Sequence, residues 1–314
     1  MRLIFFGYHN VGYFCLQVLL KMCAKWGDEI AAVVTHPDNP RENLWFASVR
    51  DLAFRHHLPV YQPEDPNDPA FVAAMARLEP DFLFSCYYRH MLKKPLLELP
   101  RRGALNLHGS LLPRYRGRVP VNWVLVHGET ETGVTLHYME EKADRGDIVD
   151  QERVPIAPQD TAYTLFAKIT AAAVEVMSRA YPLLREGTAP RIPQDHSRAS
   201  YFGGRTPEDG RIDWSRPAAE IFNLVRAVTH PYPGAFTYLQ GRKWFIWWGR
   251  PLVKFIPPEL APGQVAEAWP GQGLVVATGD GGFLIERAQL EGEPEFLGPV
   301  WALHTHLVGV RLGP

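Results

Sequence analysis

The chain has 314 residues, of which 46% are hydrophobic and 21% are charged, a composition typical of globular proteins long enough for two domains. Its formal net charge is −1, which gives no electrostatic reason to expect a nucleic acid or a membrane as partner and favours small-molecule substrates. Three cysteines without CxxC or Cys/His ligand spacing argue against a disulfide framework, and the short apolar run at the start is not typical of a signal peptide or a membrane span. These features predict a cytoplasmic protein.

The first half of the chain alternates between short apolar runs and amphipathic stretches. This alternation predicts βαβ units around a mostly parallel sheet, with helices on both faces. A longer helix is predicted over residues 161–185, ending before Gly187, so we expect an α/β catalytic domain over residues 1–187. Before that helix, the predicted elements are residues 2–6, 11–23, 29–36, 49–57, 71–78, 81–88, 104–108, 121–128 and 133–139.

The composition changes after this domain. Residues 188–210 are rich in Pro, Gly, Ser and charge and are predicted to be a linker. Over residues 211–314, one helix and several short strands separated by Gly and Pro predict a small β-barrel or open β-sandwich. The aromatic residues Trp244, Phe245, Trp247 and Trp248 could form a stacking surface for a base, but we interpret them as the core of this domain.

The segment NLHGSLLPRYRGR, residues 106–118, holds the first candidate site. Asn106 and His108 are two residues apart at the end of a predicted strand, so both side chains project from the same face. Asp144 follows another predicted strand, in a Lys-Ala-Asp-Arg-Gly turn. If the two strands are neighbours, an amide, an imidazole and a carboxylate converge at one edge of the sheet.

This trio suits transfer of an acyl group to an amine. His108 could take a proton from the attacking nitrogen, Asn106 could donate to the developing oxyanion, and Asp144 could orient and charge-stabilise the imidazole. On residue types alone, however, a histidine near an asparagine is more often a hydrogen-bonded structural residue than a catalyst.

Other chemistries are disfavoured by missing patterns. The turn FFGYHNVG lacks the G-x-G-x-x-G fingerprint of dinucleotide binding, HGSLLP lacks the G-x-S-x-G frame, and none of the twelve histidines lies in an HExxH motif. A metal mechanism is therefore not expected. Arg114, Arg116 and Arg118 could contact phosphate or carboxylate groups of a ligand.

The segment from Asn106 to Val149 strongly resembles the folate-dependent formyltransferases, whose hallmark is Asn-x-His followed by SLLP and, later, Asp-x-Gly. The likeness extends to THPDNP, SCYYRH and RTPEDGRIDWSRPAAEIFNLVRAVTHPYPGAF. Within the family, HGSLLPRYRGR and FGGRTPEDG are similar to the formyltransferase portion of the UDP-4-amino-4-deoxy-L-arabinose enzymes of lipid A modification and polymyxin resistance. Such enzymes are often fused to a decarboxylating dehydrogenase, which could here be a separate partner.

The resemblance implies a Rossmann-like catalytic domain, an OB-like C-terminal β-barrel, and 10-formyltetrahydrofolate as formyl donor. It implies transfer to the 4-amino group of a UDP-linked amino sugar, with Asn106, His108 and Asp144 as catalytic residues. A homo-oligomer is compatible with it. The residues that it places around the folate are His90, Met91, Leu92, Arg118, Glu140, Glu141, Lys142, Ala143 and Asp144.

Three alternatives remain at this point. Methionyl-tRNA formyltransferase has a similar plan, but a tRNA-binding protein should show clustered Lys and Arg. Residues 205–314 contain ten Lys and Arg against eleven Asp and Glu, and the stretch after THPDNP has no basic cluster. A non-catalytic folate- or nucleotide-binding module and a 10-formyltetrahydrofolate hydrolase are the other two.

Overall fold

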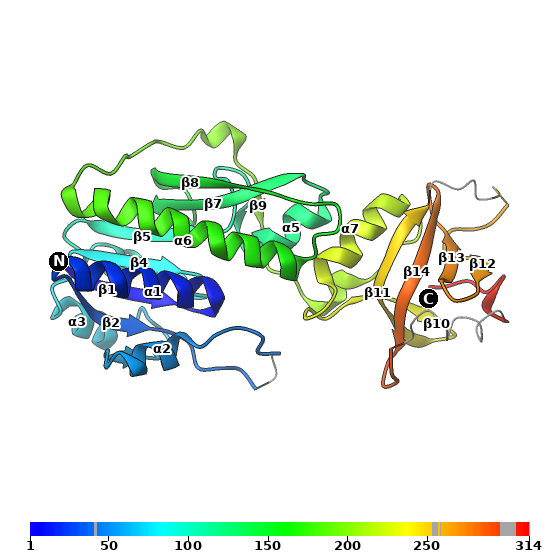
Figure 1. Cartoon of the computed structure of the whole chain (residues 1–314), viewed down its shortest axis with the longest axis horizontal. Coiled ribbons are helices and arrows are strands. Elements are labelled where there is room, and N and C mark those ends of the chain that lie inside the picture. Colours follow the sequence, from blue (N-terminus) through cyan, green and yellow to red (C-terminus); the bar gives the residue numbers. More distant parts are fainter. Residues whose placement is uncertain (41–42, 253–256, 258, 296–305, 314) are drawn as a thin grey trace. The chain divides into compact units, whose positions relative to one another are not determined.

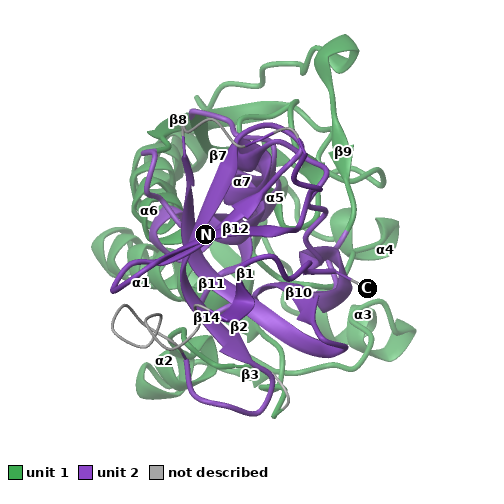
Figure 2. Cartoon of the chain, turned by 90° about the vertical axis from the view of Figure 1, so that its right-hand side faces the viewer, with its two compact units in different colours: residues 1–120, 131–156, 166–203 green, residues 121–130, 157–165, 204–314 purple. Residues whose placement is uncertain are grey.

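The computed structural model describes residues 1–40, 43–252, 257, 259–295 and 306–313. The chain forms two compact units, coloured separately in Figure 2. Unit 1 contains residues 1–120, 131–156 and 166–203, and unit 2 contains residues 121–130, 157–165 and 204–314. Two segments that the sequence assigns to the first domain, residues 121–130 and 157–165, thus pack with the C-terminal unit.

Unit 1 is built on a seven-stranded sheet with the strand order β3-β2-β1-β4-β5-β7-β8. The first five strands are parallel, whereas β7 and β8 are antiparallel, which confirms the prediction of a mostly parallel sheet. The strands are β1 (Arg2–Gly7), β2 (Glu29–Val34), β3 (Val60–Tyr61), β4 (Phe82–Cys86), β5 (Gly103–His108), β7 (Glu131–Tyr138) and β8 (Ile148–Pro155).

Helices cover both faces of this sheet because successive residues of each buried strand point to opposite sides. Ile4 and Phe6 of β1 lie in an apolar cluster with Met75 and Leu96, whereas Phe84 of β4 faces Tyr181 on the other side. Figure 1 shows α1 and α6 running side by side along one face. The helices are α1 (His9–Trp26), α2 (Val49–Arg55), α3 (Pro69–Ala76), α4 (Lys94–Leu97) and α6 (Ala162–Glu186).

The segment predicted to be a linker packs on unit 1 as far as residue 203. Ile192 bridges to Ile148, and β9 (Tyr201–Phe202) pairs in parallel with β6 (Arg116–Gly117). A 3₁₀ turn, η1 (His196–Arg198), lies between these two contacts. This segment therefore packs against the loop that follows β5, through the pairing of β9 with β6.

Unit 2 contains a five-stranded antiparallel sheet with the order β10-β11-β14-β13-β12, in agreement with the predicted small β domain. Trp244 is fully buried and Trp247 is 7% exposed, which confirms that these two aromatic side chains form core rather than a free stacking surface. The elements are α5 (Pro120–Val126), η2 (Pro207–Gly210), α7 (Ala218–Val228), β10 (Ala235–Leu239), β11 (Arg242–Leu252), β12 (Val265–Trp269), β13 (Gly273–Ala277) and β14 (Gly282–Leu290).

Within the described residues, no helix is both long and apolar enough to cross a membrane.

Candidate active site

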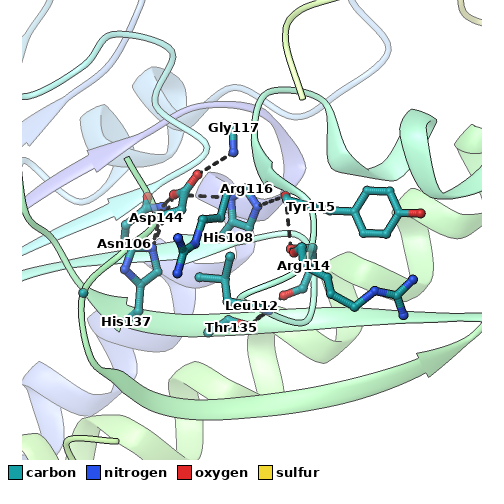
Figure 3. Close-up of polar contacts among 12 residues, drawn as sticks. Asn106, His108, Leu112, Arg114, Tyr115, Arg116, Gly117, Thr135, His137 and Asp144 are labelled. Carbon is teal, nitrogen blue, oxygen red and sulfur yellow. Dashed lines mark hydrogen bonds and ion pairs between the residues drawn. The ribbon is translucent and has the colours of Figure 1, made fainter. Parts of the chain in front are cut away.

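Strand β5 brings the predicted trio together, as Figure 3 shows. Asn106 and His108 project from one face of this strand, as the two-residue spacing predicts. Both reach the same oxygen: Asn106 Nδ2 lies 3.4 Å from Asp144 Oδ1, and His108 Nδ1 lies 3.6 Å from it. The strand that precedes Asp144, β7, is the direct neighbour of β5. The amide, the imidazole and the carboxylate therefore converge at one edge of the sheet.

The protonation of the His108 ring follows from its surroundings. Nε2 of His108 lies 2.7 Å from the backbone carbonyl oxygen of Tyr115. A carbonyl oxygen can only accept, so Nε2 must carry the proton. In the neutral ring the lone pair is therefore on Nδ1, the nitrogen that faces Asp144. The ring is 6% exposed, so its orientation is held by packing as well as by this hydrogen bond.

A second histidine, which the sequence did not indicate, belongs to the same cluster. His137 lies opposite Asn106 in the β5–β7 pair, and its Nε2 is 3.5 Å from Asp144 Oδ1 and 3.3 Å from Asn106 Nδ2. Its Nδ1 donates to the carbonyl of Tyr138 at 2.7 Å, so Nε2 of the neutral ring is an acceptor. The Asn106 amide is thus held by two long, weak hydrogen bonds.

The Asp144 side chain is 9% exposed, and its pKa is lowered in spite of this near-complete burial. Burial by itself would raise its pKa, but the positive charge that His108 and His137 carry when protonated and the backbone N–H of Gly117 together bring the pKa well below its ordinary value. The Gly117 N–H donates to Oδ2 at 2.8 Å. Gly117 has φ +98°, and a Cβ there would lie 2.2 Å from the Phe202 carbonyl oxygen. Only glycine fits this position, and it places the N–H that holds the carboxylate.

The backbone around the site is conformationally unusual. Tyr115, Val119 and Asp144 all have positive φ, with values of 57°, 47° and 56°. This region is unfavourable for residues other than glycine, above all for the β-branched Val119. Gln194 braces the Asp144 turn, because its Nε2 donates to the carbonyls of Asp144 and Gly146 at 3.0 and 2.8 Å. Strained backbone held by surrounding contacts is a feature of functional sites.

The loop after His108 is fixed by buried hydroxyl and amide groups. Thr135 Oγ1 donates to the Ser110 carbonyl at 2.7 Å and accepts from the Leu112 N–H at 3.1 Å. Gln151 Nε2 adds hydrogen bonds to the Leu112 carbonyl and to Thr135 Oγ1, at 3.0 and 2.8 Å. These contacts tie the loop to β7 and β8, so the Tyr115 carbonyl that orients His108 is itself held in place.

Arg116 does not face a ligand, contrary to one of the interpretations of the arginine cluster. It is 1% exposed, and its guanidinium donates to Gln194 Oε1 at 2.5 Å and to the Tyr201 hydroxyl at 2.5 Å. A third contact joins it to His196 Nδ1 at 2.9 Å. Arg116 therefore ties the loop to residues 194–201, whereas the Arg114 and Arg118 side chains are exposed.

We expect Arg116→Ala to lower the free energy of unfolding by about 2–4 kcal/mol, because it leaves the buried amide oxygen of Gln194 unsatisfied and opens a cavity. Urea unfolding followed by tryptophan fluorescence measures this. The control is Arg118→Ala, an exposed neighbour for which we expect a change within about 0.5 kcal/mol. Equal stabilities of the two variants would contradict the structural role of Arg116.

The other residues that the family resemblance assigns to the folate lie in two nearby segments. His90, Met91, Glu140, Glu141 and Lys142 are exposed, Ala143 is half-buried, and Leu92 is buried. Three of these residues, Met91, Leu92 and Glu141, line a pocket of about 350 Å³ together with Lys93, Lys94 and Pro95. His90, Arg118, Glu140, Lys142, Ala143 and Asp144 are not part of its lining.

Among the residues that the structure describes, no group of three or more His, Cys, Asp or Glu side chains could hold a metal ion. The three cysteines are buried as free thiols.

Comparison with known proteins gives two family matches. The model of the formyl transferase family matches residues 1–181, and the model of the formyl transferase C-terminal domain matches residues 205–302.

Several solved structures share the fold. One is WlaRD, described as a sugar 3N-formyl transferase in the presence of dTDP and 5-N-formyl-THF, with a TM-score of 0.70 and 19% identity over 94% of this chain and 99% of that one. Another is an N-formyltransferase from Helicobacter canadensis in complex with folinic acid and dTDP-3-aminofucose, with a TM-score of 0.69 and 22% identity over 92% and 98%. HypX from Aquifex aeolicus, in complex with tetrahydrofolic acid, has a TM-score of 0.60 and 20% identity over 99% of this chain and 48% of that one.

Proposed function

This chain belongs to the formyl transferase family, and from that premise we propose that it transfers a formyl group from 10-formyltetrahydrofolate to the 4-amino group of UDP-4-amino-4-deoxy-L-arabinose. One observation carries the proposal: Asn106 and His108, on one face of β5, both lie within 3.6 Å of the Asp144 carboxylate, whose pKa is lowered. An amide donor, a base and a fixed negative charge are the groups that acyl transfer to an amine requires.

In the proposed mechanism, His108 acts through Nδ1. This nitrogen accepts the proton that the acceptor amine loses as it attacks the formyl carbon, and it returns a proton to the folate nitrogen that leaves. Asp144 stays negatively charged during both transfers and stabilises the imidazolium, which carries its new proton on the side of the carboxylate.

Asn106 stabilises the oxyanion that forms on the formyl group. Its amide is held by two contacts of 3.3 and 3.4 Å, which are long for hydrogen bonds. One of them can be exchanged for a shorter, charge-assisted bond to the oxyanion at little cost. His137 and Asp144 then keep the amide in position before the donor binds.

The pocket lined by Met91, Leu92 and Glu141 supports the proposed folate site. Its lining joins three apolar residues to three charged ones, and small-molecule sites likewise combine an apolar surface with polar groups that fix the orientation of the ligand. Solved structures supply independent support, since WlaRD is described with 5-N-formyl-THF and the Helicobacter canadensis enzyme with folinic acid.

The proposed acceptor rests on two arguments. The segments HGSLLPRYRGR and FGGRTPEDG are similar in sequence to those of the UDP-amino-arabinose enzymes. The C-terminal residues 205–314 contain ten Lys and Arg against eleven Asp and Glu, so they lack the positive charge expected of a tRNA-binding enzyme. A second candidate acceptor is a dTDP-linked 3-amino sugar, because two structurally similar enzymes were solved with dTDP or dTDP-3-aminofucose.

The proposal is tested by incubating the protein with 10-formyltetrahydrofolate and one acceptor at a time. UDP-4-amino-4-deoxy-L-arabinose, dTDP-3-aminofucose and methionyl initiator tRNA are compared by mass spectrometry of the products. Formylation of the UDP sugar at the highest kcat/KM is the expected result. Formylation of tRNA alone would overturn the proposed acceptor, and release of formate without any acceptor would indicate a hydrolase.

We expect Asn106→Ala to lower kcat by about two to three orders of magnitude, as loss of an oxyanion donor does in comparable sites. Steady-state kinetics at saturating concentrations of both substrates measures this. The urea midpoint should change little, because the amide makes only long hydrogen bonds in the free protein. A kcat within threefold of the wild-type value would exclude Asn106 as the oxyanion donor.

A further inference from the structure

We propose that the pocket beside α4 binds the aminobenzoyl-glutamate end of the folate donor, and that Lys93 and Lys94 at its rim select donors with an extended γ-glutamyl tail. This inference rests on the proposed function, because it concerns the same co-substrate. It assigns a role to two lysines that the family motifs leave unassigned.

The pocket has an apolar part and a charged rim. Leu92 is buried, whereas Met91 is 56% exposed beside it, and Pro95 completes the apolar lining. An aromatic ring placed against these side chains would cover the exposed Met91, whose flexible thioether adapts to flat ligands. Lys93, Lys94 and Glu141 supply the charges of the lining.

The backbone of this pocket is fixed by one side chain from a distant part of the sequence. Asn67 Oδ1 accepts from the Lys93 N–H at 2.7 Å, and Asn67 Nδ2 donates to the Met91 carbonyl at 3.0 Å. Asp65 Oδ1 in turn accepts from the N–H and the amide of Asn67, at 2.9 and 3.0 Å. The rim is therefore built on a braced loop, which lowers the entropy lost when a ligand is bound.

The ammonium groups at the rim remain available to an anion. Lys94 pairs with Glu98 at 3.6 Å, but both side chains are more than half exposed, and such surface pairs are weak and easily exchanged. Lys93 forms no ion pair among the described residues, although its charge adds to the hydrogen bonds from Asn67 that lower the pKa of Asp65. Glu141 repels carboxylates, so an anionic tail should leave the pocket along the lysines.

A polyglutamylated folate has the complementary chemistry. Its flat aminobenzoyl amide suits the apolar lining, and each added γ-linked glutamate brings one more carboxylate. Exposed lysines attract these carboxylates through a screened interaction that weakens as salt is added. Tail length should therefore change the affinity, and the change should depend on ionic strength.

The test compares the dissociation constants of 5-formyltetrahydrofolate with one and with three glutamates, measured by calorimetry at low and high salt. At low salt we expect the wild-type protein to bind the triglutamate about five- to tenfold more tightly than the monoglutamate. In the Lys93→Gln/Lys94→Gln double variant this preference should fall below about twofold, because the triglutamate loses more affinity than the monoglutamate. Lys21→Gln, an exposed lysine on α1 outside the pocket lining, is the matched control and should keep the preference.

Glu141→Gln supplies a test of opposite sign, because removal of the repelling carboxylate should strengthen triglutamate binding. Equal affinities for the two tail lengths in the wild-type protein, or a preference that survives in the double variant, would overturn the inference. The proposed function would be contradicted by different results, namely that no folate binds or that no amine is formylated. If formyl transfer occurs without any preference for tail length, the proposed role of Lys93 and Lys94 is wrong and the proposed function still stands.

Discussion

His108→Ala should lower kcat by about two to four orders of magnitude, the range that general acid–base groups contribute. The physical reason is specific to one atom. The Tyr115 carbonyl holds the proton on Nε2, so Nδ1 is the base that receives the amine proton. In the proposed mechanism no other side chain on β5 can replace this base, so without the ring the amine would have to lose its proton to water.

The measurement is steady-state formylation at saturating donor and acceptor, across a range of pH. In the wild-type protein the rate should fall toward acid pH, because a protonated imidazole accepts no proton and a protonated amine does not attack. His56→Ala, an exposed histidine at the end of α2, is the matched control and should retain wild-type kcat.

His137→Ala decides between the two histidines of the cluster. His137 faces the same carboxylate oxygen at 3.5 Å, but the proposed mechanism uses it only to hold the Asn106 amide, so its loss should be smaller than that of His108. If His137→Ala abolished activity while His108→Ala spared it, the assignment of the base would be reversed.

Asp144→Asn should lower kcat by about three orders of magnitude, in the direction of the large losses seen when the carboxylate beside a catalytic histidine is made neutral. The asparagine amide has the size of the aspartate carboxylate. Its oxygen can still accept from the Gly117 N–H, which in the wild-type protein donates to Asp144 Oδ2 at 2.8 Å. What it lacks is the negative charge that stabilises the imidazolium. Circular dichroism should therefore show a native fold in an inactive enzyme.

The same variant should change how stability depends on pH. The pKa of Asp144 in the folded protein is lowered, whereas an unfolded aspartate titrates near 3.9. The stability that this carboxylate contributes is present above the unfolded pKa and is lost as the pH falls toward the folded pKa. Urea unfolding between about pH 6 and pH 3 should show a shallower loss of stability for Asp144→Asn than for the wild type. Parallel curves would mean that the pKa of Asp144 is not lowered in the folded protein.

Much of the fold was predictable because it follows from local patterns. Apolar runs such as residues 2–6 and 81–88 are long enough and hydrophobic enough to be strands covered on both faces, and the structure has β1 and β4 there. The antiparallel direction of β7 was not predictable in this way, since strand direction depends on the path of the connection rather than on the strand's own residues.

The compact units show the same limit. Residues 121–130 and 157–165 are part of unit 2, although they lie between segments of unit 1 in the sequence. Amino-acid composition indicates a domain boundary only where the composition itself changes along the chain, as it does after residue 187. Which segment packs with which unit is decided by long-range burial.

The two-residue spacing of Asn106 and His108 is enough to predict that their side chains share a face, because the side-chain period of a strand is two residues. The other members of the cluster come together only when the chain folds. His137 joins the cluster through the register of β5 against β7. The Arg116 side chain is turned inward by its hydrogen bond to Gln194, 78 residues away. The Tyr115 carbonyl selects the nitrogen of His108 that can act as a base. Each of these outcomes depends on contacts between residues that no local pattern connects, because hydrogen bonding and burial act through space rather than along the chain.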